Sequence, residues 1–208
     1  IVYLAFLYAP ILLLPLFAVE RTQEVIADLT QLQQAGAIPP VPIFLDSPLA
    51  IRITKVFQAH ASELEGVGER SLLTNPNLRF TETVEESKAI DRIGGGAIVI
   101  AASGMCDAGR IRHHLKRWLW TEQATVLLAG FQAQGTLGRL LAEGVDAVTI
   151  QDELIKVRAA IRQTDLYSGH ADGDELAEWL AERQPIARAL FLVHGEDEAI
   201  EALRERMV

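Results

Sequence analysis

Cysteine and basic charge are both scarce in this chain of 208 residues. A single cysteine, Cys106, excludes an internal disulfide framework and fits a reducing, cytoplasmic environment. Lys and Arg number 19 against 28 Asp and Glu, which gives a formal net charge of −9 at pH 7. The excess of acid is concentrated in residues 151–208, where thirteen acids face seven bases. This composition is not that of a non-specific nucleic-acid binder.

Internal repeats and low-complexity segments are also missing. Half of the residues are hydrophobic and 23% are charged, which is a globular composition rather than a disordered one. A chain of this length can bury a substantial core and form one ordinary domain or two small ones.

The first seventeen residues, IVYLAFLYAPILLLPLF, lack any charged side chain. A membrane anchor is one interpretation, but the run is barely long enough and contains Pro10 and Pro15. A secretory signal would need a basic region before the apolar run, and none is present. Because the chain begins at Ile1 rather than Met, we expect an internal start, with either a buried strand or a poorly defined terminus in this segment.

Short apolar segments alternate with amphipathic helical patterns over the next part of the chain. The expected strands are 41–45, 97–101, 125–129 and 147–150, and the expected helices include 19–34, 85–93, 108–118 and 136–143. Ser47 followed by Pro48 predicts the start of a further helix. The alternation predicts an α/β fold with a mostly parallel sheet flanked by helices.

Loops at the carboxyl ends of parallel strands meet at one edge of the sheet. We therefore expect Asp46–Ser47, Ser103–Met105 and Gly130–Gln132 to lie close together. The helix after the second of these loops carries the only dense basic cluster, with Arg110, Arg112, His113, His114, Lys116 and Arg117. The cluster could contact phosphates, or it could be a solvated helix face.

Two histidines occupy positions suited to chemistry in the last quarter. The segment 189–194, ALFLVH, predicts a buried strand that presents His194 at its tip, where it could ligate a metal or bond a nearby carbonyl. His170 lies in Tyr-Ser-Gly-His-Ala-Asp before a helix expected at 175–183. It could act as a general acid beside a phosphate held by the turn, or Ser168 or Asp172 could simply cap that helix. We also expect a half-exposed strand at 155–162 and a final helix at 198–207.

Taken together, an ordered series of segments is similar to one known family. The segments are LFAVERTQE (16–24), FLDSPLA (44–50), IVIAASGMCDAGRIRHHL (98–115), GFQAQGTLGR (130–139), YSGHADGDEL (167–176) and LVHGE (192–196). The chain resembles the β-CASP group of metallo-β-lactamase nucleases, which includes the 3′-end cleavage factor of pre-mRNA and bacterial and archaeal ribonucleases. The resemblance runs from about Leu13 onward.

The resemblance implies a division of the chain near residue 150. Residues 18–150 would form a β-CASP domain, and residues 151–208 would form the C-terminal part of a metallo-β-lactamase αββα domain. Residues 1–17 would be an apolar start that contributes a strand to the metallo-β-lactamase domain.

The resemblance also implies the chemistry: zinc-dependent hydrolysis of RNA, in which metal-bound hydroxide attacks phosphorus. His170 matches the family's catalytic histidine, and His194 matches a ligand of one of a pair of zinc ions. A histidine at the second position favours RNA over DNA within the family. RNA contacts are expected at the cleft-lining residues Asp46, Ser47, Ser103, Gly104, Met105, Arg110, Ser168 and Gly169.

The chain departs from the family in one large respect. The His-x-His-x-Asp-His motif that supplies the main zinc ligands does not occur in these residues. The expectation of a zinc-dependent ribonuclease therefore applies to a full-length protein that acts on single-stranded RNA, with exonuclease or endonuclease mode and a homodimer left open. The alternatives are an inactive RNA-binding or structural fragment, and a DNA nuclease of the same superfamily.

Overall fold

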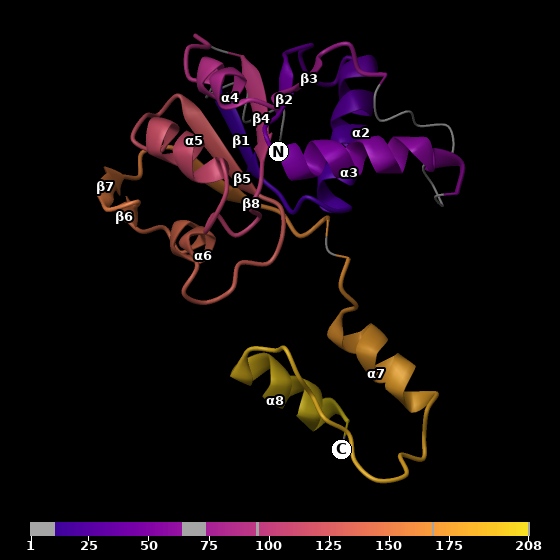
Figure 1. Cartoon of the computed structure of the whole chain (residues 1–208). Helices are drawn as coiled ribbons and strands as arrows, with labels where there is room; N and C mark the ends of the chain where they lie inside the picture. The colour runs from indigo at the N-terminus through magenta and orange to yellow at the C-terminus, as the bar shows by residue number, and fades with distance from the viewer. Residues whose placement is uncertain (1–10, 64–73, 95, 168, 208) are drawn as a thin grey trace. The chain divides into compact units, whose positions relative to one another are not determined.

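The computed structural model describes residues 11–63, 74–94, 96–167 and 169–207 (Figure 1). These residues divide into two compact units, one that ends at Tyr167 and one that follows it. We describe each unit by itself.

A six-stranded parallel sheet forms the centre of the first unit, with the strand order β3-β2-β4-β1-β5-β8. The strands are β1 (Ile11–Pro15), β2 (Ile43–Leu45), β3 (Leu78–Phe80), β4 (Ala97–Ala101), β5 (Ala124–Leu128) and β8 (Ala160–Gln163). The central strands β1, β4 and β5 are apolar along almost their whole length and buried at every position. This pattern is typical of parallel strands that are covered on both faces. The predicted α/β class with a mostly parallel sheet is confirmed.

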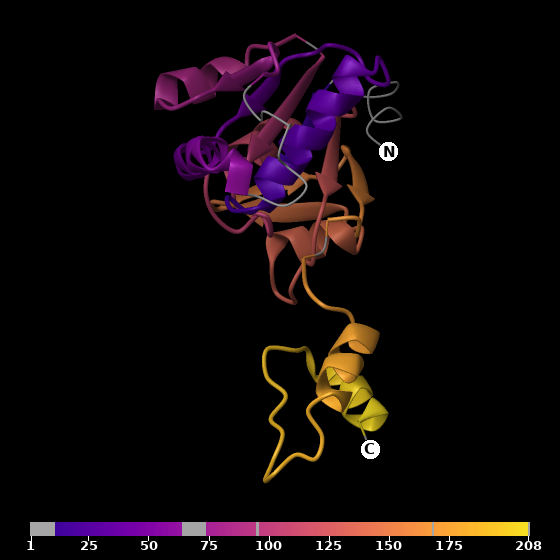
Figure 2. The ribbon, with the colours of Figure 1, turned by 90° about the vertical axis from the view of Figure 1, so that its right-hand side faces the viewer.

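Helices cover both faces of this sheet (Figures 1 and 2). One face packs against α2 (Arg21–Gln34) and α3 (Pro48–Ala59), and the other packs against α4 (Val84–Ile90), α5 (Ile111–Trp118) and α6 (Leu137–Ala142). Successive residues of a strand point to opposite faces. In β1, Leu12 and Leu14 therefore join the core beneath α2, whereas Ile11 and Leu13 join the core beneath α5.

β1 lies in the middle of the sheet, where it pairs with β4 and β5. Residues 11–15 thus belong to the sheet of the first unit, and the assignment of residues 1–17 to a strand of the metallo-β-lactamase domain stays a prediction. Residues 1–10 lie outside the described residues. No helix among the described residues is both long enough and apolar enough to cross a membrane.

The segment after α6 differs from the simple alternation expected. The strand β6 (Ala147–Ile150) has the predicted bounds, but it forms a separate antiparallel pair with β7 (Glu153–Lys156). The single strand expected at 155–162 is instead divided between β7 and β8. Between them, the backbone N–H groups of Arg158 and Ala159 both donate to the Leu119 carbonyl, and this turns the chain back towards β5.

The second unit contains α7 (Gly173–Ala181) and α8 (Asp197–Arg206). Asp172 caps α7 by accepting hydrogen bonds from the backbone of Asp174 and Glu175. The buried strand predicted at 189–194 is wrong for this structure, because these residues form no strand and Phe191 and Val193 are 83% and 70% exposed. A strand needs a paired neighbour, and the described part of this unit offers none.

Candidate functional site at the carboxyl ends of the strands

The loops that follow β1, β2, β4 and β5 meet at one edge of the sheet. The backbone N–H of Leu16 donates to Ala101, and that of Asp46 donates to Ile100, so the ends of three strands are held together. The Gln132 side chain, in the loop after β5, donates to the Gly104 carbonyl at 3.1 Å. The expected convergence of Asp46–Ser47, Ser103–Met105 and Gly130–Gln132 is therefore confirmed.

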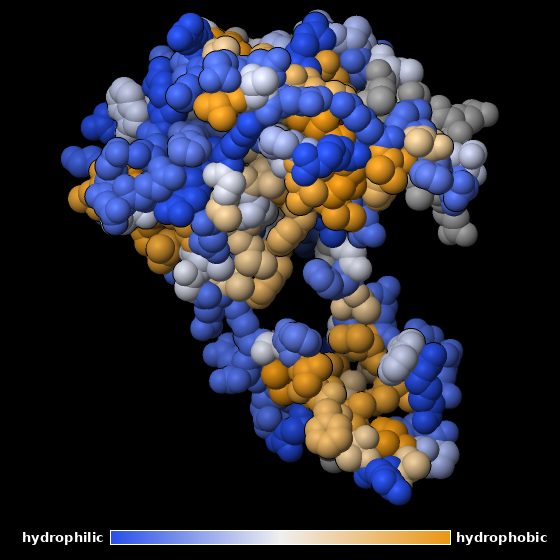
Figure 3. Space-filling view, viewed as in Figure 1, coloured by the Kyte–Doolittle hydropathy of each residue, from blue (hydrophilic) through white to orange (hydrophobic). Residues whose placement is uncertain are grey.

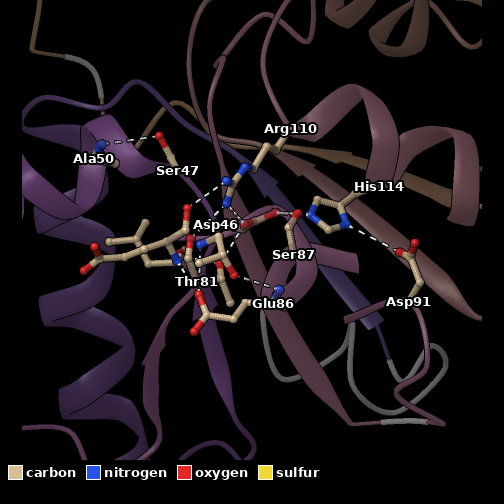
Figure 4. Close-up of polar contacts among 12 residues, drawn as sticks. Asp46, Ser47, Ala50, Thr81, Glu86, Ser87, Asp91, Arg110 and His114 are labelled. Carbon is tan, nitrogen blue, oxygen red and sulfur yellow. Dashed lines mark hydrogen bonds and ion pairs between the residues drawn. The ribbon is translucent and has the colours of Figure 1, made fainter. Parts of the chain in front are cut away.

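Asp46 is the centre of a buried polar network at this edge (Figure 4). Its side chain is completely buried and accepts four hydrogen bonds from side chains. Thr81 Oγ1 and Arg110 Nη1 donate to Oδ1 at 2.6 and 2.7 Å, and Ser87 Oγ and His114 Nε2 donate to Oδ2 at 2.6 and 2.7 Å. These donors come from the segment after β3 and from α4 and α5, so the network joins elements that are far apart in sequence.

The network keeps the Asp46 carboxyl ionised. Burial is the largest single influence and by itself would raise the pKa, but the four donors together outweigh it and lower the pKa to about 2. A buried carboxylate with all its donors supplied by the protein stabilises the arrangement of those donors. Direct contact between Asp46 and RNA stays a prediction, and in this structure the carboxylate instead fixes Arg110.

Arg110 is held from several sides. Besides Asp46, its guanidinium donates to the carbonyls of Thr81 and Glu82, at 2.9 Å each, and 19% of its side chain remains exposed. Ser47 is also engaged in the fold, because its Oγ accepts from the backbone N–H of Ala50 and caps α3. The predicted cap and the proline at the first position of α3 are confirmed.

The loop between β4 and α5 is tightly constrained. A side chain on Gly104 would come within 2.9 Å of the Phe17 ring, and one on Gly109 would come within 2.3 Å of the Ala102 carbonyl oxygen. Gly109 also has a φ of +74°, which favours glycine. Ser103 and Met105 are partly exposed on this loop. The backbone of this loop is therefore held in a fixed position next to Arg110. Contact between RNA and Ser103, Gly104 or Met105 stays a prediction.

His170, His194 and Gly169 lie in the second unit, and all three are exposed. Ser168 lies outside the described residues. The segment before it is anchored in the first unit, where the Tyr167 hydroxyl donates to Asp28 Oδ2 at 2.8 Å. Burial beside Asp28 raises the pKa of Tyr167 well above its usual value. The roles expected for His170 and His194 stay predictions.

Zinc in proteins takes at least three protein ligands of the His, Cys or carboxylate type. No group of three such side chains comes together within the described part of the chain. His194 can offer one imidazole ligand, but these residues do not form a complete zinc site by themselves.

Sequence inspection missed the most organised feature of this edge, the network that includes His114, Thr81 and Ser87. His114 was visible only as one cation in a basic cluster, yet it is 2% exposed. One signal was available, since Arg110 and His114 are four residues apart and lie on the same helix face, where both could face a carboxylate. The threonine and serine gave no comparable signal.

Two family models match the chain. The Beta-Casp domain matches residues 22–141, more than half of the chain. The chain belongs to the β-CASP family. A second model, described as the Zn-dependent metallo-hydrolase RNA specificity domain, matches residues 154–208 of this β-CASP protein.

Curated relatives agree with this assignment. Ribonuclease TTHA0252 of Thermus thermophilus is 36% identical over 197 residues, a match that covers 92% of this chain and 44% of the relative. Transcription termination factor FttA is 27% identical over 201 residues in Methanosarcina mazei and 31% identical over 196 residues in Thermococcus kodakarensis. The matches cover 91% and 88% of the β-CASP chain, and 31% and 30% of the two FttA proteins. The chain therefore spans less than half the length of these relatives.

Proposed function

We propose that this chain is part of a zinc-dependent ribonuclease that hydrolyses phosphodiester bonds of single-stranded RNA in the cytoplasm. The observation that carries the proposal is the match of residues 154–208 to an RNA specificity domain of zinc-dependent metallo-hydrolases. That match includes His170 and His194. The relative named as a ribonuclease supports the same substrate.

Within this proposal His170 acts as a general acid. Its imidazole is exposed and precedes the N-terminus of α7, where Asp172 accepts two backbone hydrogen bonds. A histidine side chain is a common general acid, and in this role it would donate a proton to the oxygen that leaves phosphorus. Ser168 and Gly169, which precede it, would hold a phosphate oxygen.

His194 would supply one zinc ligand. Zinc provides Lewis acidity when it is bound, and the remaining ligands would come from residues outside this chain. At the sheet edge of the first unit, Arg110 would face the RNA backbone from the position fixed by Asp46. Asp46, Ser47 and the loop Ser103–Met105 would line the RNA-binding surface at this edge of the sheet.

The test uses the full-length protein and labelled single-stranded RNA. Cleavage that requires zinc and is lost in His170→Ala supports the proposal. Equal cleavage of single-stranded DNA in competition would replace it with the alternative of a DNA nuclease.

A second candidate is an RNA-binding module without hydrolytic activity of its own. The absence of a three-ligand group among the described residues favours it for the 208-residue chain alone. If the purified chain takes up zinc and cleaves RNA, this candidate fails. RNA binding without zinc uptake or cleavage would support it.

A further inference from the structure

A cavity lined mainly by charged and polar residues lies between α4 and α5, next to the Asp46 network. It has a volume of about 420 Å³, and its lining includes Ser87 and Asp91 from the α4 region. Arg110, just before α5, and His113, His114, Lys116 and Arg117 of α5 also line it, and Val84 and Lys88 of α4 complete it. All of these residues belong to the first unit.

The cavity concentrates positive charge in an acidic protein. Four of its lining residues are Lys or Arg, and Asp91 is the only acid among them, although the whole chain has a net charge of −9. Figure 3 shows hydrophilic side chains over much of the surface around α4 and α5. A concave site with one sign of charge attracts ligands of the opposite sign.

Part of this charge is not neutralised by the protein. Arg110 is paired with Asp46, and Lys116 Nζ lies 2.5 Å from Glu153. Among the described residues, Lys88, His113 and Arg117 have no paired carboxylate. The Arg117 guanidinium is instead stacked 4.5 Å from the centre of the Trp118 ring, which orients it and leaves its donors available.

A buried nitrogen in the wall of the same cavity makes no hydrogen bond. His114 is 2% exposed, and its Nε2 donates to Asp46 while its Nδ1 has no hydrogen bond (Figure 4). Asp91 Oδ1 lies 3.9 Å from this Nδ1, a distance that allows the ion-pair contact drawn in Figure 4 but is too long for a hydrogen bond. Buried polar atoms are rarely left without a partner, so an unpaired nitrogen in a cavity wall points to a group that occupies the cavity.

We propose that this cavity is a phosphate-binding site of the first unit, in which Lys88 and Arg117 neutralise the anion and the imidazoles of His113 and His114 bond to it. A protonated His114 donates to a phosphate oxygen, and a neutral His114 accepts from a water that bridges to the phosphate. A cation is excluded as the ligand by the surrounding Lys and Arg side chains, which outnumber Asp91. We assign this phosphate to the RNA backbone, and this assignment rests on the proposed function. The preference of the cavity for phosphate follows from its own residues and does not depend on that function.

The first test measures binding of the 208-residue chain to a short fluorescent oligouridylate at several salt concentrations. Each phosphate contact to a single strand contributes about 0.7 to the slope of log affinity against log salt. Lys88→Gln combined with Arg117→Gln should therefore bind more weakly than the wild type. The affinity ratio between the two should be about sevenfold larger at 50 mM than at 200 mM salt.

Two control variants accompany this measurement. Arg52→Gln combined with Arg162→Gln removes the same charge from exposed positions outside the cavity and should leave that ratio nearly constant. The single variant Arg117→Lys keeps the positive charge at this position and should retain most of the affinity for the oligouridylate. Equal losses in the two double Gln variants would overturn the proposal, as would unchanged binding of the cavity variant.

A second test separates free phosphate from RNA. Inorganic phosphate and the oligouridylate are each titrated into the chain while the imidazole signals of His113 and His114 are followed by NMR at constant pH. Saturable shifts with both ligands support the proposal. Shifts with inorganic phosphate alone overturn the choice of RNA, and no shift with either overturns the site. Failure of the proposed function would look different. In that case the full-length protein would not hydrolyse RNA, but RNA binding that depends on the cavity residues would persist.

Discussion

At the scale of single residues, the interior charge of Asp46 determines how the sheet edge is organised. Replacing it by Asn keeps the size but removes the charge that Arg110 and His114 face. Breaking a buried ion pair from one side costs about 3 kcal/mol or more. We expect Asp46→Asn to lower the free energy of unfolding by about that amount in urea titrations.

The matched control is Asp91→Asn. Asp91 also faces His114, but 39% of its side chain is exposed and it is 3.9 Å away. Its replacement should change stability by no more than about 0.5 kcal/mol. Similar losses in both variants would show that the Asp46 network is not the stabilising feature.

Acid should weaken the fold through the same carboxyl group. The pKa of Asp46 is about 2 in the folded state against 3.8 for an aspartate in water, so the folded state binds the proton less readily. The stabilisation is complete above the unfolded pKa and is lost as the pH falls from about 4 to about 2. The expected loss over that window is about 2 kcal/mol. Unfolding of the wild type and of Asp46→Asn at each pH checks this, because the variant should lack that part of the acid dependence.

At the scale of elements, the loop between β4 and α5 should be the least tolerant of substitution. Gly109→Ala would combine a strained positive φ with a contact 2.3 Å from the Ala102 carbonyl oxygen. Gly144 has a similar φ of +79° but open space around it. We expect Gly144→Ala to cost about 1 kcal/mol and Gly109→Ala at least about 2 kcal/mol more in thermal or urea unfolding. Equal costs would mean that the close approach is unimportant.

Elements whose signal is local were predictable from the sequence. The strand 97–101 and the start of α3 at Ser47–Pro48 have the predicted positions, because an apolar run between turns and a cap followed by proline are set by neighbouring residues. The pairing of 147–150 with β7 could not be predicted in this way, since it depends on a partner strand rather than on the strand itself. The family resemblance, carried by several ordered segments, was a stronger guide than any one of them.

The site was predictable only in part for the same reason. The sequence indicates which loops share the sheet edge, and Arg110 and Asp46 were both expected there. It does not indicate that Asp46 is completely buried or that His114 from α5 reaches it, because those facts depend on how α4 and α5 pack on the sheet.

At the scale of the whole molecule, the second unit carries an uncovered apolar surface. Apolar side chains gather there around α7 and α8, where a cavity of about 590 Å³ is lined by Leu190, Val193 and Trp179 among others (Figure 3). Exposed apolar patches of this kind mark surfaces that other protein segments cover. Residues 189–194 have the apolar composition of a buried strand, which agrees with the idea that another protein segment covers this surface.

A single substitution tests this surface in the 208-residue chain. Phe191 is 83% exposed, so Phe191→Asp should leave the free energy of unfolding within about 0.5 kcal/mol of the wild type. It should also reduce the fluorescence of a bound hydrophobic dye. A large loss of stability instead would show that Phe191 is already buried in the chain alone.

Zinc content and turnover of the full-length protein, measured together on labelled single-stranded RNA, test the central claim of RNA hydrolysis most directly. A general acid contributes about a hundredfold or more to the rate. The account therefore predicts that His170→Ala lowers turnover by at least about that factor while zinc is retained, and that His194→Ala loses part of the zinc. Equal loss of metal in both variants, or unchanged turnover in His170→Ala, would contradict it.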